Sequence, residues 1–241
     1  MKGTTLKMSN KRYSLLFLIV GIVVLLVITG CRQTQLGETE KIKTFQNNYE
    51  LVGEEKAQIV AGISSHIFDE IDRSNEEALE EFVIRPSREV GQLHSLPEGR
   101  YQLHPEYSGN VYIRDQDGTL IYHSILGSRY GVETITIDLK ETFTIEADGG
   151  LTWVYIYPVE TDITNELTAG IWKVGLDVAP GTYQVTEYSG LGYFEVWELN
   201  EEPRLYELIG SGFNQTNPEV TLEEGQVIRL TGVSSLVLDP M

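Results

Sequence analysis

The chain has 241 residues, with 18 lysine and arginine residues against 36 aspartate and glutamate residues, and its formal net charge at pH 7 is −18. This length allows one or two domains with a sizeable hydrophobic core. An acidic body excludes nucleic acid as a partner, because phosphates require a basic surface. The single cysteine excludes a disulfide within the chain, so stability must come from core packing.

The N-terminus has the pattern of an export leader. Four basic residues, Lys2, Lys7, Lys11 and Arg12, precede an apolar run over residues 14–29. Basic residues on that side keep the N-terminus in the cytoplasm and send the following chain across the membrane. The run is shorter than the roughly 20 residues that comfortably span a bilayer.

The residues that end the apolar run are Ile28-Thr29-Gly30-Cys31. They resemble the lipobox of bacterial lipoproteins, in which a branched apolar residue and two small residues precede a cysteine. The resemblance implies that residues 1–30 are a signal peptide, that Cys31 is the lipid attachment site, and that the protein is anchored in the cell membrane on its extracytoplasmic side. Two acyl chains give stable anchoring. The alternative is an uncleaved helix with an incidental cysteine, which also places the rest of the chain outside the cytoplasmic membrane.

Residues 31–52 are polar and mixed in charge, which predicts a tether. Residues 53–86 are predicted to form a helical hairpin. Ile59, Ile63, Ile67 and Ile71 recur every four residues and predict a helix over residues 54–73. The Ser74-Asn75-Glu76-Glu77 stretch resembles a capping box and predicts a second, short helix to about residue 82. We expect this hairpin to pack on the β segment that follows, with a partner helix or dimer contact as the alternative.

Two later segments, residues 87–160 and 168–241, carry one sequence pattern at an offset of 81 to 85 residues. Gly99 and Tyr101 of the first match Gly181 and Tyr183 of the second, and the match continues to residues 143–145, aligned with 228–230. Alternating apolar and polar residues, interrupted by turn residues every 8 to 12 positions, predict short strands. The chain is therefore predicted to be mainly β, with two tandem β-sandwich or jelly-roll-like modules. We expect Tyr101 and Tyr183 to face inward and lock the corner before each strand.

The second copy opens with Val174-Gly175-Leu176-Asp177-Val178-Ala179-Pro180-Gly181-Thr182-Tyr183. This stretch resembles a small module, often tandem, in surface lipoproteins of Gram-positive bacteria, with the signature Val-Gly-x-Asp-Ile-x-x-Gly-x-Tyr. The first copy has one extra residue and carries Leu93 in place of the aspartate. The resemblance implies no catalytic activity and no defined ligand. We expect the signature positions to be structural: Val90, Gly91, Gly99, Tyr101, Val174, Gly175, Asp177, Gly181 and Tyr183.

Motifs for catalysis are missing from the sequence, which has no nucleophile elbow, zinc-protease motif or phosphate loop. The four histidines, His66, His94, His104 and His123, lack the spacing of a zinc site. The Asp115-Gln116-Asp117-Gly118 stretch begins like a calcium loop but lacks the downstream glutamate, so it predicts a hairpin turn. We expect no enzyme activity, no metal and no cofactor.

Four aromatic residues form a candidate binding face. Tyr107 and Tyr188 precede Ser-Gly turns in the two copies, and Tyr193 and Trp197 lie on the following predicted strand. Exposed aromatics on a sandwich could stack on sugar rings, and core packing is the alternative for each of them. The sequence thus predicts a lipid-anchored, non-enzymatic binding or adhesion protein whose partner is a cell-wall glycan or a surface protein. The alternatives are a structural spacer without a ligand and a carboxylate-dependent hydrolase.

Overall fold

The computed structural model describes residues 40–74, 76–78, 81–83, 94–127, 129–210 and 215–241. Backbone contacts divide the chain into residues 1–43 and a second unit, Thr44–Met241, which contains all the elements below. The predicted leader, Cys31, Val90 and Gly91 lie outside the described residues.

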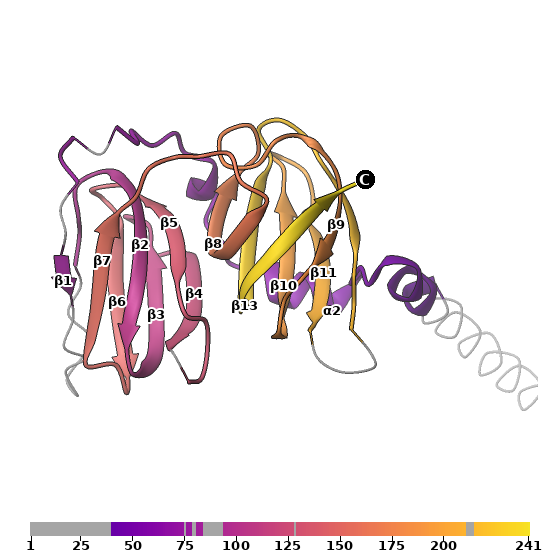
Figure 1. The fold of residues 1–241 in the computed structure, drawn as a ribbon, viewed down its shortest axis with the longest axis horizontal. Coiled ribbons are helices and arrows are strands. Elements are labelled where there is room, and N and C mark those ends of the chain that lie inside the picture. Colours follow the sequence, from indigo (N-terminus) through magenta and orange to yellow (C-terminus); the bar gives the residue numbers. More distant parts are fainter. Residues whose placement is uncertain (1–39, 75, 79–80, 84–93, 128, 211–214) are drawn as a thin grey trace, which may run out of the picture. The chain divides into compact units, whose positions relative to one another are not determined.

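The described chain is mainly β, as predicted, and is compatible with a β-sandwich (Figure 1). We call residues 99–158 the first β segment and residues 166–240 the second. The strands of the first are β2 (Gly99–Glu106), β3 (Ser108–Arg114), β4 (Leu120–Gly127), β5 (Ile135–Leu139), β6 (Thr144–Gly149) and β7 (Trp153–Pro158). The strands of the second are β8 (Glu166–Lys173), β9 (Gly181–Thr186), β10 (Gly190–Trp197), β11 (Arg204–Ile209), β12 (Glu219–Leu222) and β13 (Val227–Pro240).

The strands form two sheets. A ten-stranded sheet has the order β1-β7-β2-β5-β8-β13-β10-β11, with β9 and β12 joined to it through β13, and a three-stranded sheet has the order β4-β3-β6. Strand β1 (Glu81–Val83) pairs with β7. The link between the two β segments is the parallel pair of β5 with β8, where Thr136 lies opposite Gly170. One sheet therefore runs through both segments.

Backbone pairing follows the same scheme in the two β segments. Tyr101 pairs with Ile137 and Pro158, and Tyr183 pairs with Val220 and Pro240. The proline follows its tyrosine at the same distance along the chain in both segments.

The predicted alignment of residues 143–145 with residues 228–230 is shifted by two residues in the structure. Ile113 lies opposite Ile145, and its counterpart Val196 lies opposite Ile228, not Leu230. Side chains alternate with a period of two along a strand, so a shift of two residues keeps the same face buried and leaves the sequence pattern unchanged.

The two corner tyrosines face inward as predicted. Tyr101 is 0% exposed and Tyr183 is 4% exposed. Each hydroxyl donates to the carbonyl oxygen four residues earlier, Tyr101 to Pro97 at 2.9 Å and Tyr183 to Ala179 at 2.7 Å. Each tyrosine thus ties its strand to the turn that precedes it.

Replacing either tyrosine by phenylalanine removes this hydrogen bond and leaves the ring in place. We expect Tyr101→Phe and Tyr183→Phe each to lower the free energy of unfolding by about 1 kcal/mol, measured by urea denaturation. Tyr130→Phe is the matched control, because Tyr130 is 68% exposed and should give no measurable change. An equal loss in all three variants would contradict a role for the two corner hydroxyls.

The buried cores of the two β segments are in contact. The core of the first includes Ile171 from β8 and Val227 from β13, and Trp197 packs against it. The Tyr122 hydroxyl on β4 donates to the carbonyl oxygen of Leu230 on β13 at 2.7 Å. The two segments therefore share a buried boundary.

The helical hairpin predicted for residues 53–86 is wrong. Helix α2 covers only Glu54–Val60, and a 3-10 helix, η1, covers Ser65–Phe68. Strand β1 overlaps the end of the expected second helix. Gly62, with φ +73°, follows the extended Ala61, and Ile63 pairs with Leu120. Apolar residues every four positions also share one face of an extended chain, so the pattern does not separate helix from strand.

The end of the predicted tether also packs on the second β segment. The side chain of Asn48 accepts from the Glu219 amide and donates to the Glu219 carbonyl oxygen, both at 2.7 Å. Glu50 pairs with Tyr206 on β11, and Leu51 is buried. The folded unit therefore begins before residue 52, because residues 48–51 cover an edge strand.

Candidate functional site

The signature turn follows strand β8 and is closed by Asp177. The Gly175 amide donates to the Val178 carbonyl oxygen at 2.7 Å, and the Asp177 amide donates to the Lys173 carbonyl oxygen at 2.8 Å. The Asp177 carboxylate accepts from the Lys173 amide at 2.7 Å. Gly175 has a φ of +97°, and a side chain there would meet the carboxylate of Glu224. The Val-Gly-x-Asp sequence thus matches the geometry that this turn requires.

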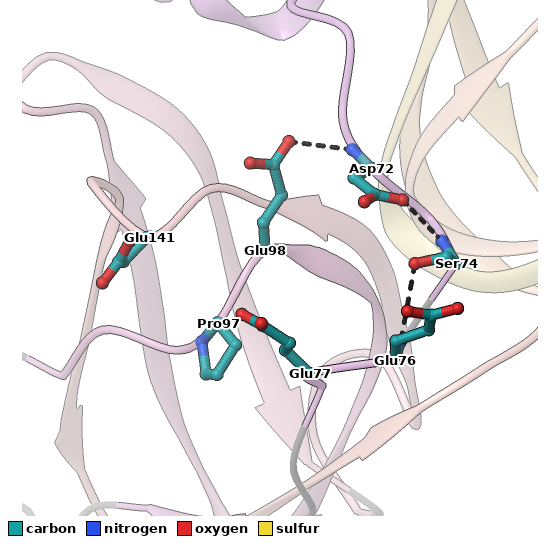
Figure 2. A pocket seen from close by; sticks show the side chains of 7 residues that line it. All are labelled: Asp72, Ser74, Glu76, Glu77, Pro97, Glu98 and Glu141. Atoms are coloured by element: carbon teal, nitrogen blue, oxygen red, sulfur yellow. Dashed lines mark hydrogen bonds between the residues drawn. The ribbon is translucent and has the colours of Figure 1, made fainter.

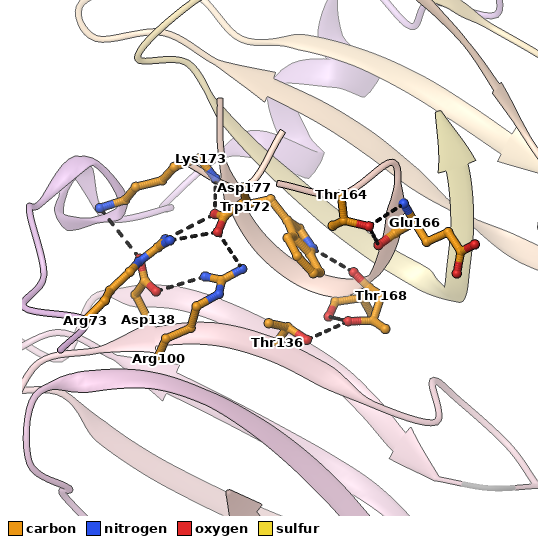
Figure 3. A network of polar contacts seen from close by, with 11 residues as sticks. Arg73, Arg100, Thr136, Asp138, Thr164, Glu166, Thr168, Trp172, Lys173 and Asp177 are labelled. Atoms are coloured by element: carbon orange, nitrogen blue, oxygen red, sulfur yellow. Dashed lines mark hydrogen bonds and ion pairs between the residues drawn. The ribbon is translucent and has the colours of Figure 1, made fainter. Parts of the chain in front are cut away.

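Asp177 also belongs to a buried ion cluster, which we define as Arg73, Arg100, Asp138, Lys173 and Asp177 (Figure 3). Arg73 binds Asp138 at 2.6 Å and Asp177 at 2.7 Å. Arg100 binds Asp138 at 2.9 Å and Asp177 at 3.2 Å. The Lys173 amine lies 3.7 Å from Asp138. The ion cluster therefore joins the chain before the first β segment, that segment, and the second β segment.

Burial controls the electrostatics of the ion cluster. Burial lowers the pKa of Arg100 and of Lys173, and the attraction of Asp138 and Asp177 offsets this shift only in part. Burial also lowers the pKa of Arg73, but its bonds to Asp177 and Asp138 outweigh burial and raise the pKa overall. Both oxygens of the Asp138 carboxylate and both oxygens of the Asp177 carboxylate accept hydrogen bonds from arginine. Neither carboxylate is therefore free to act as a general acid or base in this arrangement.

The ring of Trp172 extends the ion cluster along β8. The Arg100 guanidinium carbon lies 4.8 Å from the centre of the Trp172 ring, and the indole N–H donates to the Thr168 carbonyl oxygen at 2.8 Å. This cation–π contact favours a fixed position for Arg100.

The four aromatic residues of the candidate binding face have different environments. Tyr188 is 6% exposed and its hydroxyl lies 2.7 Å from Thr216 Oγ1, so its assignment to an exposed face is wrong. Tyr193 and Trp197 are half-buried, and the Trp197 indole N–H donates to Glu195 at 2.9 Å. Tyr107 is 66% exposed. Of these residues, Tyr107 alone presents most of its ring to solvent.

The remaining signature positions lie in or beside the core. Val174 is 2% exposed, Gly99 is buried, and Gly181 begins β9 directly after the Pro180 corner. In the described part of the chain, no group of three or more histidine, cysteine, aspartate and glutamate side chains is placed to hold a metal ion.

The histidines have separate surroundings. His66 lies 2.8 Å from the carboxylate of Asp69, and the backbone of His94 pairs with Ile145. Burial lowers the pKa of His104 and of His123, and the His123 ring stacks on Tyr112 with 4.5 Å between ring centres.

Asp115 forms the predicted hairpin turn. Its carboxylate accepts from the amides of Asp117 and Thr119 at 2.9 and 2.8 Å and from the Ser64 hydroxyl at 2.5 Å. Burial raises the pKa of this carboxyl, but the hydrogen bonds from Ser64, Thr119 and Asp117 outweigh burial and lower it below 3.8.

The depressed pKa of Asp115 predicts acid sensitivity. Its contribution to stability is fully present above the unfolded value of about 3.8 and is lost as the pH falls through the lower folded value. We expect Asp115→Asn to flatten the fall in urea midpoint below about pH 4. Asp117→Asn is the control, and an unchanged slope in Asp115→Asn would contradict the prediction.

Two surface hollows, not foreseen from the sequence, flank residues 69–74, which we call the strap. The acidic hollow has a volume of about 320 Å³ and is lined by five carboxylates with Ser74 and Pro97 (Figure 2). The carboxylates belong to Asp72, Glu76, Glu77, Glu98 and Glu141. The second hollow has about 450 Å³ and lies beside the signature turn, so we call it the Leu176 groove.

No helix in the described ranges is long and apolar enough to cross a membrane. Comparison of the chain with protein-family models, with curated proteins and with solved structures gives no match.

Proposed function

We propose that the protein is a lipid-anchored extracytoplasmic lipoprotein with a non-enzymatic binding function. The observation that carries the proposal is the Ile28-Thr29-Gly30-Cys31 sequence directly after an apolar run with basic residues before it. The thiol at that point can take one diacylglyceryl group through a thioether bond, and the two acyl chains of that group anchor a protein stably.

The anchored part consists, in this proposal, of two copies of one β module. The shared pairing of Tyr101 with Pro158 and of Tyr183 with Pro240 supports it, as do the two corner hydrogen bonds. Two copies held together by the ion cluster suit the display of a surface to an envelope polymer or a partner protein.

At the ion cluster a binding or structural role is favoured over hydrolysis, because arginine holds both of its carboxylates, Asp138 and Asp177. A structural spacer without a ligand is the second candidate function. It is supported by the ion cluster, which joins the two β segments.

Lipid attachment is tested by feeding bacteria that express the full chain with a clickable fatty acid. We expect the wild-type chain to be labelled, to fractionate with membranes and to lack residues 1–30 by intact mass. Cys31→Ser should lose the label, and Thr34→Ser is the matched control that should keep it. A wild-type chain that retains residues 1–30 without label would instead establish the uncleaved helix.

A further inference from the structure

The Leu176 groove is lined by both apolar side chains and carboxylates. Its apolar surface comes from Phe68, Ile71, Val174, Leu176 and Val227. Leu176 is 51% exposed, although it lies in the signature turn between the buried residues Val174 and Asp177. Two exposed carboxylates, those of Glu70 and Glu224, also line it. A large apolar side chain of a partner could bury its surface here, while the partner residues next to it contact the carboxylates.

The strap borders both hollows, because Ile71 lines the groove and the next residue, Asp72, lines the acidic hollow. Polar contacts along its length hold the strap in place. The Lys173 amine donates to the Asp69 carbonyl oxygen, the Asp72 amide donates to Glu98 at 2.8 Å, and Arg73 enters the ion cluster. Both hollows are therefore formed before any partner arrives, which lowers the cost of ordering on binding.

The charges lining the two hollows are unbalanced. Seven carboxylates face them, and the one cation among the lining residues, Lys173, directs its amine at Asp69 and Asp138. A neutral sugar carries no charge to complement these carboxylates, and an anionic polymer is repelled by them. A polyamine supplies the charge but has no apolar side chain for the groove. A basic polypeptide with a large apolar side chain supplies both the positive charge for the carboxylates and the apolar group for the groove.

We propose that the Leu176 groove and the acidic hollow together bind a basic polypeptide segment of a partner protein, with one large apolar side chain seated beside Leu176. This inference rests on the proposed binding function and names its partner class and its site.

The test measures binding of three fluorescent twelve-residue peptides to the full chain in nonionic detergent, with detergent alone as the blank. One peptide alternates lysine with leucine, one alternates lysine with serine, and one alternates glutamate with leucine. We expect saturable binding of the lysine–leucine peptide, at least about tenfold tighter than either of the others and weakened in about 0.5 M salt.

Two variants place this binding in the site. Leu176→Asp and Glu224→Lys should each weaken it by about tenfold. The matched controls are Leu191→Asp, at the start of β10 and 68% exposed in the wild type, and Glu166→Lys, at the opposite end of β8 from Lys173. Both controls should bind within about twofold of the wild type.

The proposal is overturned if the lysine–leucine peptide does not bind or if the control variants lose as much affinity as the groove variants. It is also overturned if the glutamate–leucine peptide binds equally well, or if cell-wall glycan is the ligand that Leu176→Asp and Glu224→Lys release. A chain that is lipidated at Cys31 and binds cell walls through another surface would refute the groove alone. An unlipidated chain that binds the peptide at the groove would refute the proposed lipid anchoring alone.

Discussion

Replacing Gly170 by alanine is expected to lower the free energy of unfolding by about 4 kcal/mol. Gly170 has a φ of +138°, a region that is open almost only to glycine. An added Cβ would lie 1.8 Å from the backbone carbonyl oxygen of Thr136, which cannot move without breaking the sheet. This contact is the point where β5 meets β8, so the alanine should weaken the link between the two β segments.

Gly118→Ala separates backbone strain from steric clash. Gly118 also has a positive φ, +78°, but an added Cβ there would have nothing within 4 Å. We expect this control to cost about 1 kcal/mol. The measurement is urea unfolding of both variants beside the wild type. Equal losses at Gly118 and Gly170 would contradict the close approach of β5 and β8.

The local features of the fold are predictable from the sequence, and the long-range ones are not. Turn residues and apolar alternation predict the strands, and the Pro-Gly corners predict the inward tyrosines. The meeting of Gly170 with Thr136 leaves no local signal, because Gly170 reads as an ordinary glycine within an apolar strand. The four-residue spacing of Ile59, Ile63, Ile67 and Ile71 predicts a helix wrongly, because this spacing fits the period of a strand as well as that of a helix.

The candidate site shows the same division. Asp177 stands out in the sequence as a signature residue, but its partners Arg73 and Arg100 lie far from it along the chain. Gly99, Arg100 and Tyr101 are buried in succession, so both faces of β2 are covered at that point. Alternation cannot identify a charged residue that is buried on the second face of a strand. The two hollows depend on the strap, whose course follows from the ion cluster.

Replacing Asp177 by alanine is expected to lower the free energy of unfolding by about 3 to 5 kcal/mol, the cost of leaving buried charges without their partner. Arg73 and Arg100 would each lose one of their two carboxylates, and the Lys173 amide would lose its acceptor. Urea unfolding at neutral pH measures the loss. Glu166→Ala is the matched control, since Glu166 is exposed and should change stability by no more than about 0.5 kcal/mol.

A double-mutant cycle with Arg100→Met tests whether the loss comes from the unpaired charge. If it does, Arg100→Met combined with Asp177→Ala should cost at least about 1 kcal/mol less than the sum of the two single losses. The reason is that the double variant removes a cation together with its partner and leaves less buried charge unpaired. Additive losses would show that Asp177 acts through Arg73 and the Lys173 amide, not through Arg100. Coupled losses would establish that Asp177 helps to tie the second β segment to the first through Arg100, which its position within the signature does not reveal.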